Sequence, residues 1–256
     1  MSTRPVALIT GASSGIGAAL AEHLAPTHDL VLVARRRARL EALADTLDTR
    51  TEVLVADLAT RPDLDRVVAR VNQGDLNVVI SNAGVGGYAP LAEVAPAEVD
   101  RLWTLNAIAP LVLARAAVPH LIKAGGGGVI TIASLLAFSS GLGLNPYPPR
   151  TLYAGAKAAT VAFTRSLAGE LDGTGVTATV VCPGLVATEW SGGANHDNPR
   201  AMSPQDVATA AWTAFTRGDT VCVPALDDPD LFEHFTDAEA ALLNAGNRST
   251  LATRYR

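Results

Sequence analysis

Cysteine, aromatic residues and net charge are all scarce in this chain of 256 residues. Its two cysteines exclude a disulfide-stabilised scaffold and a zinc site built from four thiolates. Its net charge of −5 gives no electrostatic reason to expect a nucleic-acid or anionic-membrane partner. Its hydrophobic fraction of 48% is nonetheless too high for a disordered chain. These figures predict a compact cytoplasmic protein and leave its chemistry open.

Long hydrophobic runs are also missing. The long uncharged stretch between Lys123 and Arg150 has a continuous apolar part only over Val129–Phe138. A membrane-spanning helix needs about 20 apolar residues, so this stretch is too short to cross a bilayer. The first residues do not form the apolar core and cleavage site of a signal peptide. We therefore expect neither a membrane span nor a secretory signal.

Two sequence patterns alternate along the chain. Short runs of β-branched apolar residues are separated by longer segments with helical periodicity. The runs are apolar through their length, which is typical of strands buried on both faces of a parallel sheet. The predicted strands are Val6–Thr10, Leu30–Ala34, Glu52–Ala56, Val78–Ser81, Val129–Ser134, Val176–Cys182 and Thr220–Pro224. The predicted helices are Gly15–Ala25, Arg37–Leu47, Asp63–Asn72, Ala97–Ile122, Leu152–Leu171 and Pro204–Arg217.

This order predicts an α/β fold with a doubly wound parallel sheet of about seven strands, flanked by helices. We find no linker that would divide residues 1–256, so we expect one Rossmann-type domain. Residues 226–256 are more polar and form a C-terminal extension with an amphipathic patch at Asp237–Asn244.

A glycine-rich segment, Thr10-Gly-Ala-Ser-Ser-Gly-Ile-Gly17, follows the first predicted strand directly. Small residues let the backbone turn tightly and approach a pyrophosphate, while the following helix presents its amides and positive dipole end to that anion. The spacing Gly-x3-Gly-x-Gly differs from the general G-x-G-x-x-G fingerprint. An ordinary loop is the alternative interpretation, but the position between a strand and a helix favours a dinucleotide site.

The end of the second predicted strand indicates which dinucleotide binds. An acidic residue there would bind the ribose 2′-hydroxyl of NAD, whereas an arginine would accommodate the 2′-phosphate of NADP. This chain has Arg35-Arg36-Arg37 at that point and no acidic residue. A solvated basic helix start is the alternative, yet arginines at a helix N-terminus oppose its dipole, and a bound phosphate would relieve that conflict. The sequence favours NADP(H) over NAD(H).

Tyr153 and Lys157 open the fifth predicted helix. A spacing of four residues puts both side chains on one helix face. A free tyrosine has a pKa near 10, and a neighbouring cation favours its phenolate and moves that pKa toward a useful range for acid–base chemistry. Such a pair is commonly only a surface contact, so it becomes informative together with the glycine turn.

Taken together, these motifs resemble the short-chain dehydrogenase/reductase family. The resemblance covers about residues 5–224, and the order of its motifs is more specific than any one of them. Besides the glycine turn and the Tyr153–Lys157 pair, it rests on Asp57-Leu58, Ser81-Asn82-Ala83-Gly84, Asn106, Ser134, and Pro183-Gly184 followed by Thr188.

The resemblance implies a role for each matching residue. Tyr153 would be the general acid in carbonyl reduction or the general base in alcohol oxidation, and Lys157 would bind the nicotinamide ribose and lower the tyrosine pKa. Ser134 would hydrogen-bond the carbonyl oxygen, and Asn106 would hold a water in the proton relay. Residues 185–203 would include the substrate lid loop. The residues expected to hold the cofactor are Gly11, Ser13, Ser14, Gly15, Ile16, Gly17, Arg35, Arg36, Asp57, Leu58, Asn82, Ala83, Gly84, Tyr153, Lys157, Pro183, Gly184, Val186 and Thr188.

The sequence departs from the family pattern in two places. Ser81 replaces the first asparagine of the usual Asn-Asn-Ala-Gly. The distance from Ser134 to Tyr153 is longer than usual, and Ser140 fits the usual spacing better. We favour Ser134 because it ends the fifth predicted strand, directly after Val-Ile-Thr-Ile-Ala, and a strand end should direct its side chain into the cleft. We interpret Gly141–Arg150 as an enlarged loop. Tyr147 is set aside because position 151 is threonine rather than lysine.

The remaining reactive residues show no pattern of a second site. The five histidines have no metal-ligand spacing, so no metal site is predicted. Cys182 and Cys222 fall in predicted strands and are expected to be buried thiols.

The sequence therefore predicts an oxidoreductase that transfers a hydride between NADP(H) and a small-molecule carbonyl or alcohol. A nucleotide-binding regulatory protein of the same fold, without turnover, is the alternative. The resemblance also implies a homodimer or homotetramer, with Ala97–Ile122 and Leu152–Leu171 at the interface. The pocket-forming segments carry no charge pattern that identifies the substrate.

Overall fold

The computed structural model describes residues 4–139, 149–193, 195 and 197–256. The chain forms two compact units, residues 1–224 and residues 225–256, and each is described by itself. Ser140, Tyr147 and most of the predicted loop Gly141–Arg150 lie outside the described residues.

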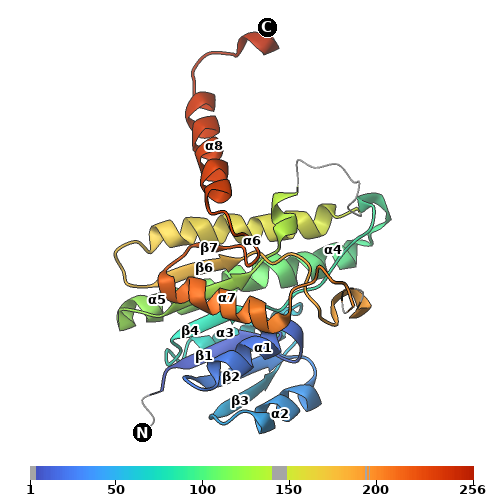
Figure 1. The fold of residues 1–256 in the computed structure, drawn as a ribbon, viewed down its shortest axis with the longest axis vertical. Coiled ribbons are helices and arrows are strands. Elements are labelled where there is room, and N and C mark those ends of the chain that lie inside the picture. Colours follow the sequence, from blue (N-terminus) through green and yellow to red (C-terminus); the bar gives the residue numbers. More distant parts are fainter. Residues whose placement is uncertain (1–3, 140–148, 194, 196) are drawn as a thin grey trace. The chain divides into compact units, whose positions relative to one another are not determined.

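The first unit is built on one sheet of seven strands in the order β3-β2-β1-β4-β5-β6-β7 (Figure 1). All neighbouring strands pair in parallel. The strand order runs outward from β1 and β4, which is the doubly wound arrangement with its switch point between them. The strands are β1 (Val6–Thr10), β2 (Asp29–Ala34), β3 (Thr51–Val55), β4 (Val78–Ser81), β5 (Gly128–Ile132), β6 (Thr177–Val181) and β7 (Val221–Cys222). The predicted fold class is confirmed.

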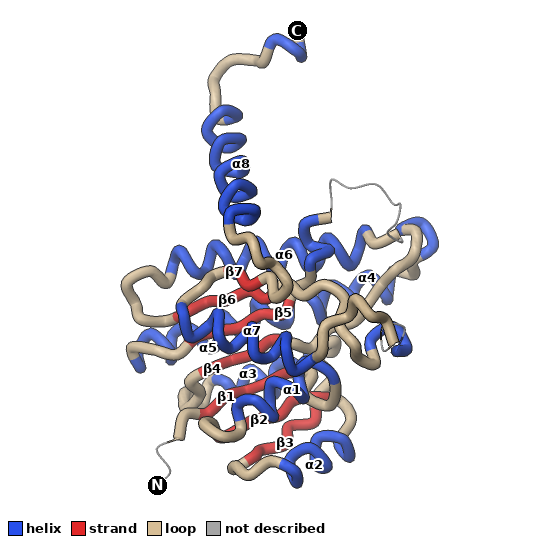
Figure 2. Tube along the Cα trace, viewed as in Figure 1, coloured by secondary structure: helices blue, strands red, loops and turns tan. Residues whose placement is uncertain are grey.

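Helices cover both faces of this sheet (Figure 2). Along β1, Ala7 and Ile9 belong to the core shared with α1, α2 and α7, whereas Leu8 belongs to the core shared with α3, α5 and α6. Both sets of strand side chains are buried, which explains why the strand sequences are apolar throughout. The helices are α1 (Gly15–Leu24), α2 (Arg37–Thr46), α3 (Arg61–Val71), α4 (Pro96–Trp103), α5 (Ala109–Ala124), α6 (Thr151–Glu170) and α7 (Pro204–Arg217).

Helical structure runs without interruption from Pro96 to Ala124, as the pattern over Ala97–Ile122 predicted, and a π-helical turn, Thr104–Ile108, lies between α4 and α5. Pro110 has no amide hydrogen, so the carbonyl of Asn106 cannot accept the usual bond from the residue four positions later. That carbonyl instead accepts a hydrogen bond from Thr160 Oγ1 at 2.8 Å. The widened turn thus ties Asn106 to α6, and such turns are frequent at functional sites.

The helical run Pro96–Ala124 is long and apolar enough to cross a membrane, judged by length and composition alone. Half of its most apolar window is buried inside the structure. Leu113 and Leu121 of α5 belong to the core against the sheet. Packing against the sheet therefore accounts for the apolar character of this helix.

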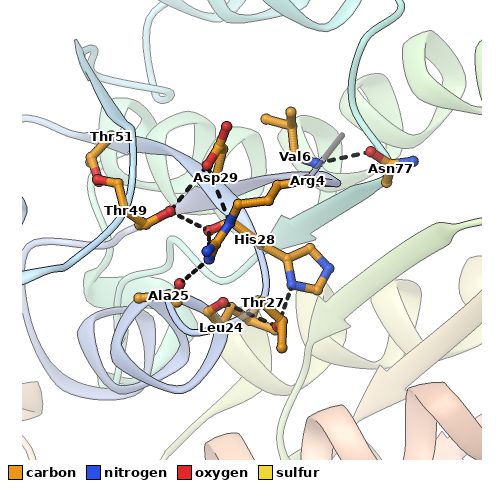
Figure 3. Close-up of polar contacts among 10 residues, drawn as sticks. All are labelled: Arg4, Val6, Leu24, Ala25, Thr27, His28, Asp29, Thr49, Thr51 and Asn77. Carbon is orange, nitrogen blue, oxygen red and sulfur yellow. Dashed lines mark hydrogen bonds and ion pairs between the residues drawn. The ribbon is translucent and has the colours of Figure 1, made fainter. Parts of the chain in front are cut away.

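A polar network fixes the edge where β1 and β2 begin (Figure 3). Arg4 donates hydrogen bonds to the carbonyls of Ala25 and His28, and its Nε lies 3.5 Å from Asp29 Oδ1. Thr49 Oγ1 donates to the same His28 carbonyl at 2.7 Å. The edge lies at the amino ends of the strands, opposite the glycine turn, and its contacts stabilise the fold.

The second unit contains α8 (Asp230–Gly246) and a short 3₁₀ turn at Thr253–Tyr255. The helix extends in both directions beyond the predicted amphipathic patch Asp237–Asn244.

Candidate active site

The glycine turn joins β1 to α1 in a conformation that requires glycine. Gly11 and Gly15 have φ values of +69° and +56°, a region that other residues rarely adopt. A Cβ atom on Gly11 would lie 2.9 Å from the Cα atom of Ala83, and one on Gly17 would lie 2.5 Å from Asn82 Nδ2. The side chain of Ser14 does not cap α1, so the first amides of the helix are available to an anion.

The turn is held against the end of β4 by a set of short hydrogen bonds. Asn82 Nδ2 donates to the carbonyl of Thr10 at 2.9 Å. Thr10 Oγ1 accepts from the backbone amides of Asn82 and Ala83, both at 3.0 Å. Ile16 packs against the core from the first turn of α1. The predicted residues of β1, α1 and β4 therefore meet at the switch point of the sheet.

Three charged side chains meet beside this turn. Arg36, at the N-cap of α2, donates to Ser13 Oγ at 2.9 Å and to Ser14 Oγ at 2.7 Å. Its NH1 atom also donates to Glu189 Oε2 at 3.0 Å. Arg39 NH1 lies 2.6 Å from Glu189 Oε1. These arginine bonds hold the pKa of the Glu189 carboxyl below its ordinary value.

Arg35 points to another acidic residue. Its NH1 atom lies 3.7 Å from Asp57 Oδ2. Asp57 accepts a bond from the amide of Ala59, and Leu58 is buried in the core. Arg35 and Asp57, both expected to hold the cofactor, thus lie side by side.

Asn106 is fully buried below the loop that follows β4. Its Oδ1 accepts from the Val85 amide at 3.2 Å, and its Nδ2 donates to the Val85 carbonyl at 3.0 Å. A Cβ atom on Gly84 would lie 2.7 Å from Asn106 Oδ1 and 3.5 Å from Lys157 Nζ. The structure therefore brings Gly84, Asn106 and Lys157 to one place.

Tyr153 is 5% exposed and lies in an aromatic cluster. Its ring centre is 5.4 Å from that of Tyr88 and 5.9 Å from that of Trp190. Burial raises the pKa of the Tyr153 phenol well above its ordinary value, the nearby Tyr88 raises it further, and a hydrogen bond with Ser134 lowers it. The phenol is protonated at neutral pH.

Lys157 Nζ is 5.8 Å from the centre of the Tyr153 ring and donates to the Ile132 carbonyl at 2.8 Å. Burial lowers the pKa of this amine to about 8. Burial sets the direction of the Tyr153 pKa shift, and the Lys157 amine is directed at the Ile132 carbonyl. The expectation that Lys157 lowers the Tyr153 pKa stays a prediction.

Ser134 begins a 3₁₀ turn, Leu135–Phe138, directly after β5. Its hydroxyl accepts from the Leu136 amide at 3.1 Å in addition to its bond with Tyr153. Ser139, further along the turn, accepts from Arg150 Nε at 2.7 Å. Of the described serines near Tyr153, Ser134 is the one that contacts its phenol.

The segment after β6 closes the other side of this site. Leu135 donates its amide to the Pro183 carbonyl, and a Cβ atom on Gly184 would lie 3.4 Å from Leu135 Cδ1. Val186 pairs with Met202 in an isolated β-bridge, which anchors the predicted lid segment at residues 185–203. Thr188 lies over the glycine turn, 3.0 Å from a Cβ atom placed on Gly15.

The site includes residues that the sequence interpretation left out. Arg39 is one helical turn beyond Arg36, a spacing that could have indicated a shared face. Glu189 and Trp190 fall within the predicted lid segment 185–203 but were given no role of their own. Tyr88 carried no signal, because a loop brings it to the site.

Comparisons with known proteins identify the family of the chain. A family model described as short chain dehydrogenase matches residues 5–199. The chain belongs to the short-chain dehydrogenase/reductase family. It is therefore an oxidoreductase of that family, as the sequence predicted.

An uncharacterised oxidoreductase of Staphylococcus epidermidis is 32% identical over 215 residues, which cover 83% of this chain and 91% of that protein. A solved short-chain dehydrogenase from Sphingobium yanoikuyae, in complex with NADPH, is 32% identical with a TM-score of 0.90 and covers 98% of this chain and 100% of its own. The bulky-bulky ketone specific alcohol dehydrogenase from Comamonas testosteroni is 30% identical with a TM-score of 0.88, covering 99% of both chains.

Cys182 lies beside this site, next to Lys157 and the backbone of Ser134, and burial raises the pKa of its thiol. Within the described ranges, no group of three or more His, Cys, Asp or Glu side chains is placed to hold a metal ion. Cys182 and Cys222 are buried free thiols, as predicted.

Proposed function

We propose that this protein is an NADP(H)-dependent reductase that interconverts a ketone and the corresponding alcohol. The observation that carries the proposal is the buried Tyr153 phenol, hydrogen-bonded with Ser134, one helical turn from Lys157. A protein that only binds a nucleotide has no need for a buried phenol at this position. The regulatory alternative is therefore not favoured.

The residues beside Tyr153 fit a nicotinamide dinucleotide. The glycines leave a cradle that a Cβ atom would fill, and the uncapped amides of α1 face it. Arg36 and Arg39 offer guanidinium groups to a 2′-phosphate, and the related Sphingobium enzyme binds NADPH. When bound, the nicotinamide would supply or accept the hydride.

The chain's own residues would supply the proton and the orientation. Ser134 and Tyr153 would donate hydrogen bonds to the substrate oxygen, and Tyr153 would transfer its proton to that oxygen as the carbonyl carbon is reduced. A raised pKa keeps Tyr153 protonated, which suits the reductive direction. Lys157 would hold the nicotinamide ribose, and Asn106 would hold a water from which the proton is replaced.

The walls of the site favour an apolar ketone. Tyr88 and Trp190 flank Tyr153. Leu135 and Leu185, which follow Ser134 and Gly184 in the sequence, have exposed side chains. Such walls gain free energy by burying hydrocarbon. The related Comamonas enzyme is a bulky-bulky ketone specific alcohol dehydrogenase, which supports the same substrate class here.

We also propose a cytoplasmic homo-oligomer, as the resemblance implied. Ile108, Leu111 and Ile122, on or beside α5, expose apolar side chains. This helix, together with α6, would supply the subunit interface.

The test is a panel of ketones with small and bulky substituents, incubated with the purified protein and NADPH or NADH. We expect ketone-dependent loss of NADPH absorbance, greatest with bulky apolar ketones. Nucleotide binding without turnover across the panel would support the regulatory alternative.

A further inference from the structure

Glu189 occupies the place where the proposed function puts a phosphate. Its carboxylate bridges Arg36 and Arg39, with oxygen–nitrogen distances of 3.0 and 2.6 Å. Arg36 is at the same time bonded to Ser13 and Ser14 of the glycine turn. A carboxylate held between two guanidinium groups offers them a negative charge and acceptor oxygens, as a phosphate in the same place would, with less charge and two oxygens instead of three.

The backbone on both sides of Glu189 is held, so its carboxylate is positioned in advance. Thr188 lies against Gly15, and its Oγ1 accepts from the Trp190 amide at 3.2 Å. The Trp190 ring packs on Tyr153, with 5.9 Å between the ring centres. A pre-positioned anion loses less conformational entropy when it pairs with the arginines than a free side chain would.

The arginines have few other described acidic contacts. Arg35 pairs with Asp57 and Arg37 with Glu41, whereas Glu189 is the carboxylate that the structure records on both Arg36 and Arg39. The carboxylate contacts the NH1 atom of each guanidinium group, and its charge of −1 offsets part of their combined charge of +2, so an incoming anion competes with it.

We infer that Glu189 is a specificity-determining residue, an internal anion that competes with the 2′-phosphate of the cofactor for Arg36 and Arg39. The inference rests on the proposed NADP(H) dependence. Glu189 lowers the affinity for the phosphorylated dinucleotide and leaves the affinity for NAD(H) nearly unchanged. It thereby makes the preference for NADP(H) over NAD(H) smaller than the arginines alone would make it.

The test is calorimetric binding of 2′,5′-ADP, which carries the phosphate, and of 5′-AMP, which lacks it. We compare the wild-type protein with Glu189→Gln and with a matched control, Glu41→Gln. Glu41 pairs with Arg37 on α2. Its replacement therefore removes one negative charge near the start of α2, as Glu189→Gln does, and leaves the recorded contacts of Arg36 and Arg39 intact.

Glu189→Gln should bind 2′,5′-ADP about two- to fivefold more tightly than wild type, the range expected for losing exposed ion pairs, with 5′-AMP unchanged. The gain should shrink at high salt, and Glu41→Gln should show none of it. Equal changes for both nucleotides, no change, or weaker 2′,5′-ADP binding would each overturn the inference.

The two proposals fail in different ways. A wild-type protein and a Glu189→Gln variant that both bind the two nucleotides equally would overturn the inference and the NADP(H) preference. Ketone turnover, measured separately, would still stand. A preference for 2′,5′-ADP that Glu189→Gln leaves unaltered would overturn the inference alone.

Discussion

The buried amine of Lys157 predicts a specific dependence of folding stability on pH. Lys157 is 4% exposed, and burial lowers the pKa of its side chain from 10.5 to about 8. Between these two values the unfolded chain carries a proton that the folded chain has released. Stability contributed by this group therefore rises with pH over that window. Integrated from about pH 7 to about pH 10, the linkage amounts to about 2–3 kcal/mol.

Replacing Lys157 with methionine removes the titrating group and keeps the side-chain length similar. The free energy of unfolding would be measured by urea denaturation, followed by circular dichroism, at several pH values across the window. The difference between wild type and Lys157→Met should shift in favour of wild type by about 2–3 kcal/mol as the pH rises. Loss of packing changes the absolute difference and leaves this shift intact.

Lys123→Met is the matched control, because Lys123 is exposed at the end of α5. Its difference from wild type should stay constant with pH. A Lys157→Met difference that is equally constant would refute the account of Lys157 as a buried amine with a lowered pKa.

Three further changes test other parts of the structure. Burial lowers the pKa of His28 below its ordinary 6.5, so the free energy of unfolding should fall as the pH drops below that value. In acid denaturation, His28→Gln should reduce this loss of stability. An acid denaturation profile identical to that of wild type would contradict the prediction. Gly17→Ala places a Cβ atom 2.5 Å from Asn82 Nδ2 and should cost about 1–3 kcal/mol of stability while abolishing nucleotide binding by calorimetry, whereas normal affinity would show that the turn is not the binding site. Arg35→Ala combined with Arg36→Ala should weaken NADPH binding about tenfold or more and NADH binding much less, and an unchanged ratio would show that these arginines do not select the cofactor.

The sequence was sufficient for the fold because the strands are buried on both faces. In β1, the core contacts of Leu8 on one side and of Ala7 and Ile9 on the other require an unbroken apolar run, which is visible without a structure. The glycines of the turn were equally visible, because close approach to Asn82 and Ala83 leaves no room for a Cβ atom. Apolar strands and glycine turns can therefore be predicted from short segments of the sequence.

Features that depend on distant contacts could not be predicted in the same way. The π-helical turn around Asn106 depends on Pro110 together with a hydroxyl from α6. The pKa of Tyr153 is raised because its phenol is buried, beside the rings of Tyr88 and Trp190 from two other segments. The sequence showed only the spacing to Lys157, which favoured a lowered pKa. Glu189 reaches Arg36 across most of the chain, and the overall charge could not reveal that pair.

The most direct test of the central claim is the rate of ketone reduction by Tyr153→Phe, measured beside its NADPH affinity. The variant removes only the phenolic hydroxyl, and Tyr255→Phe serves as a control at an exposed position. We expect unchanged NADPH affinity with turnover reduced at least roughly a hundredfold, the lower end for loss of a general acid. Near-normal turnover in Tyr153→Phe would contradict the assignment of Tyr153 as the proton donor.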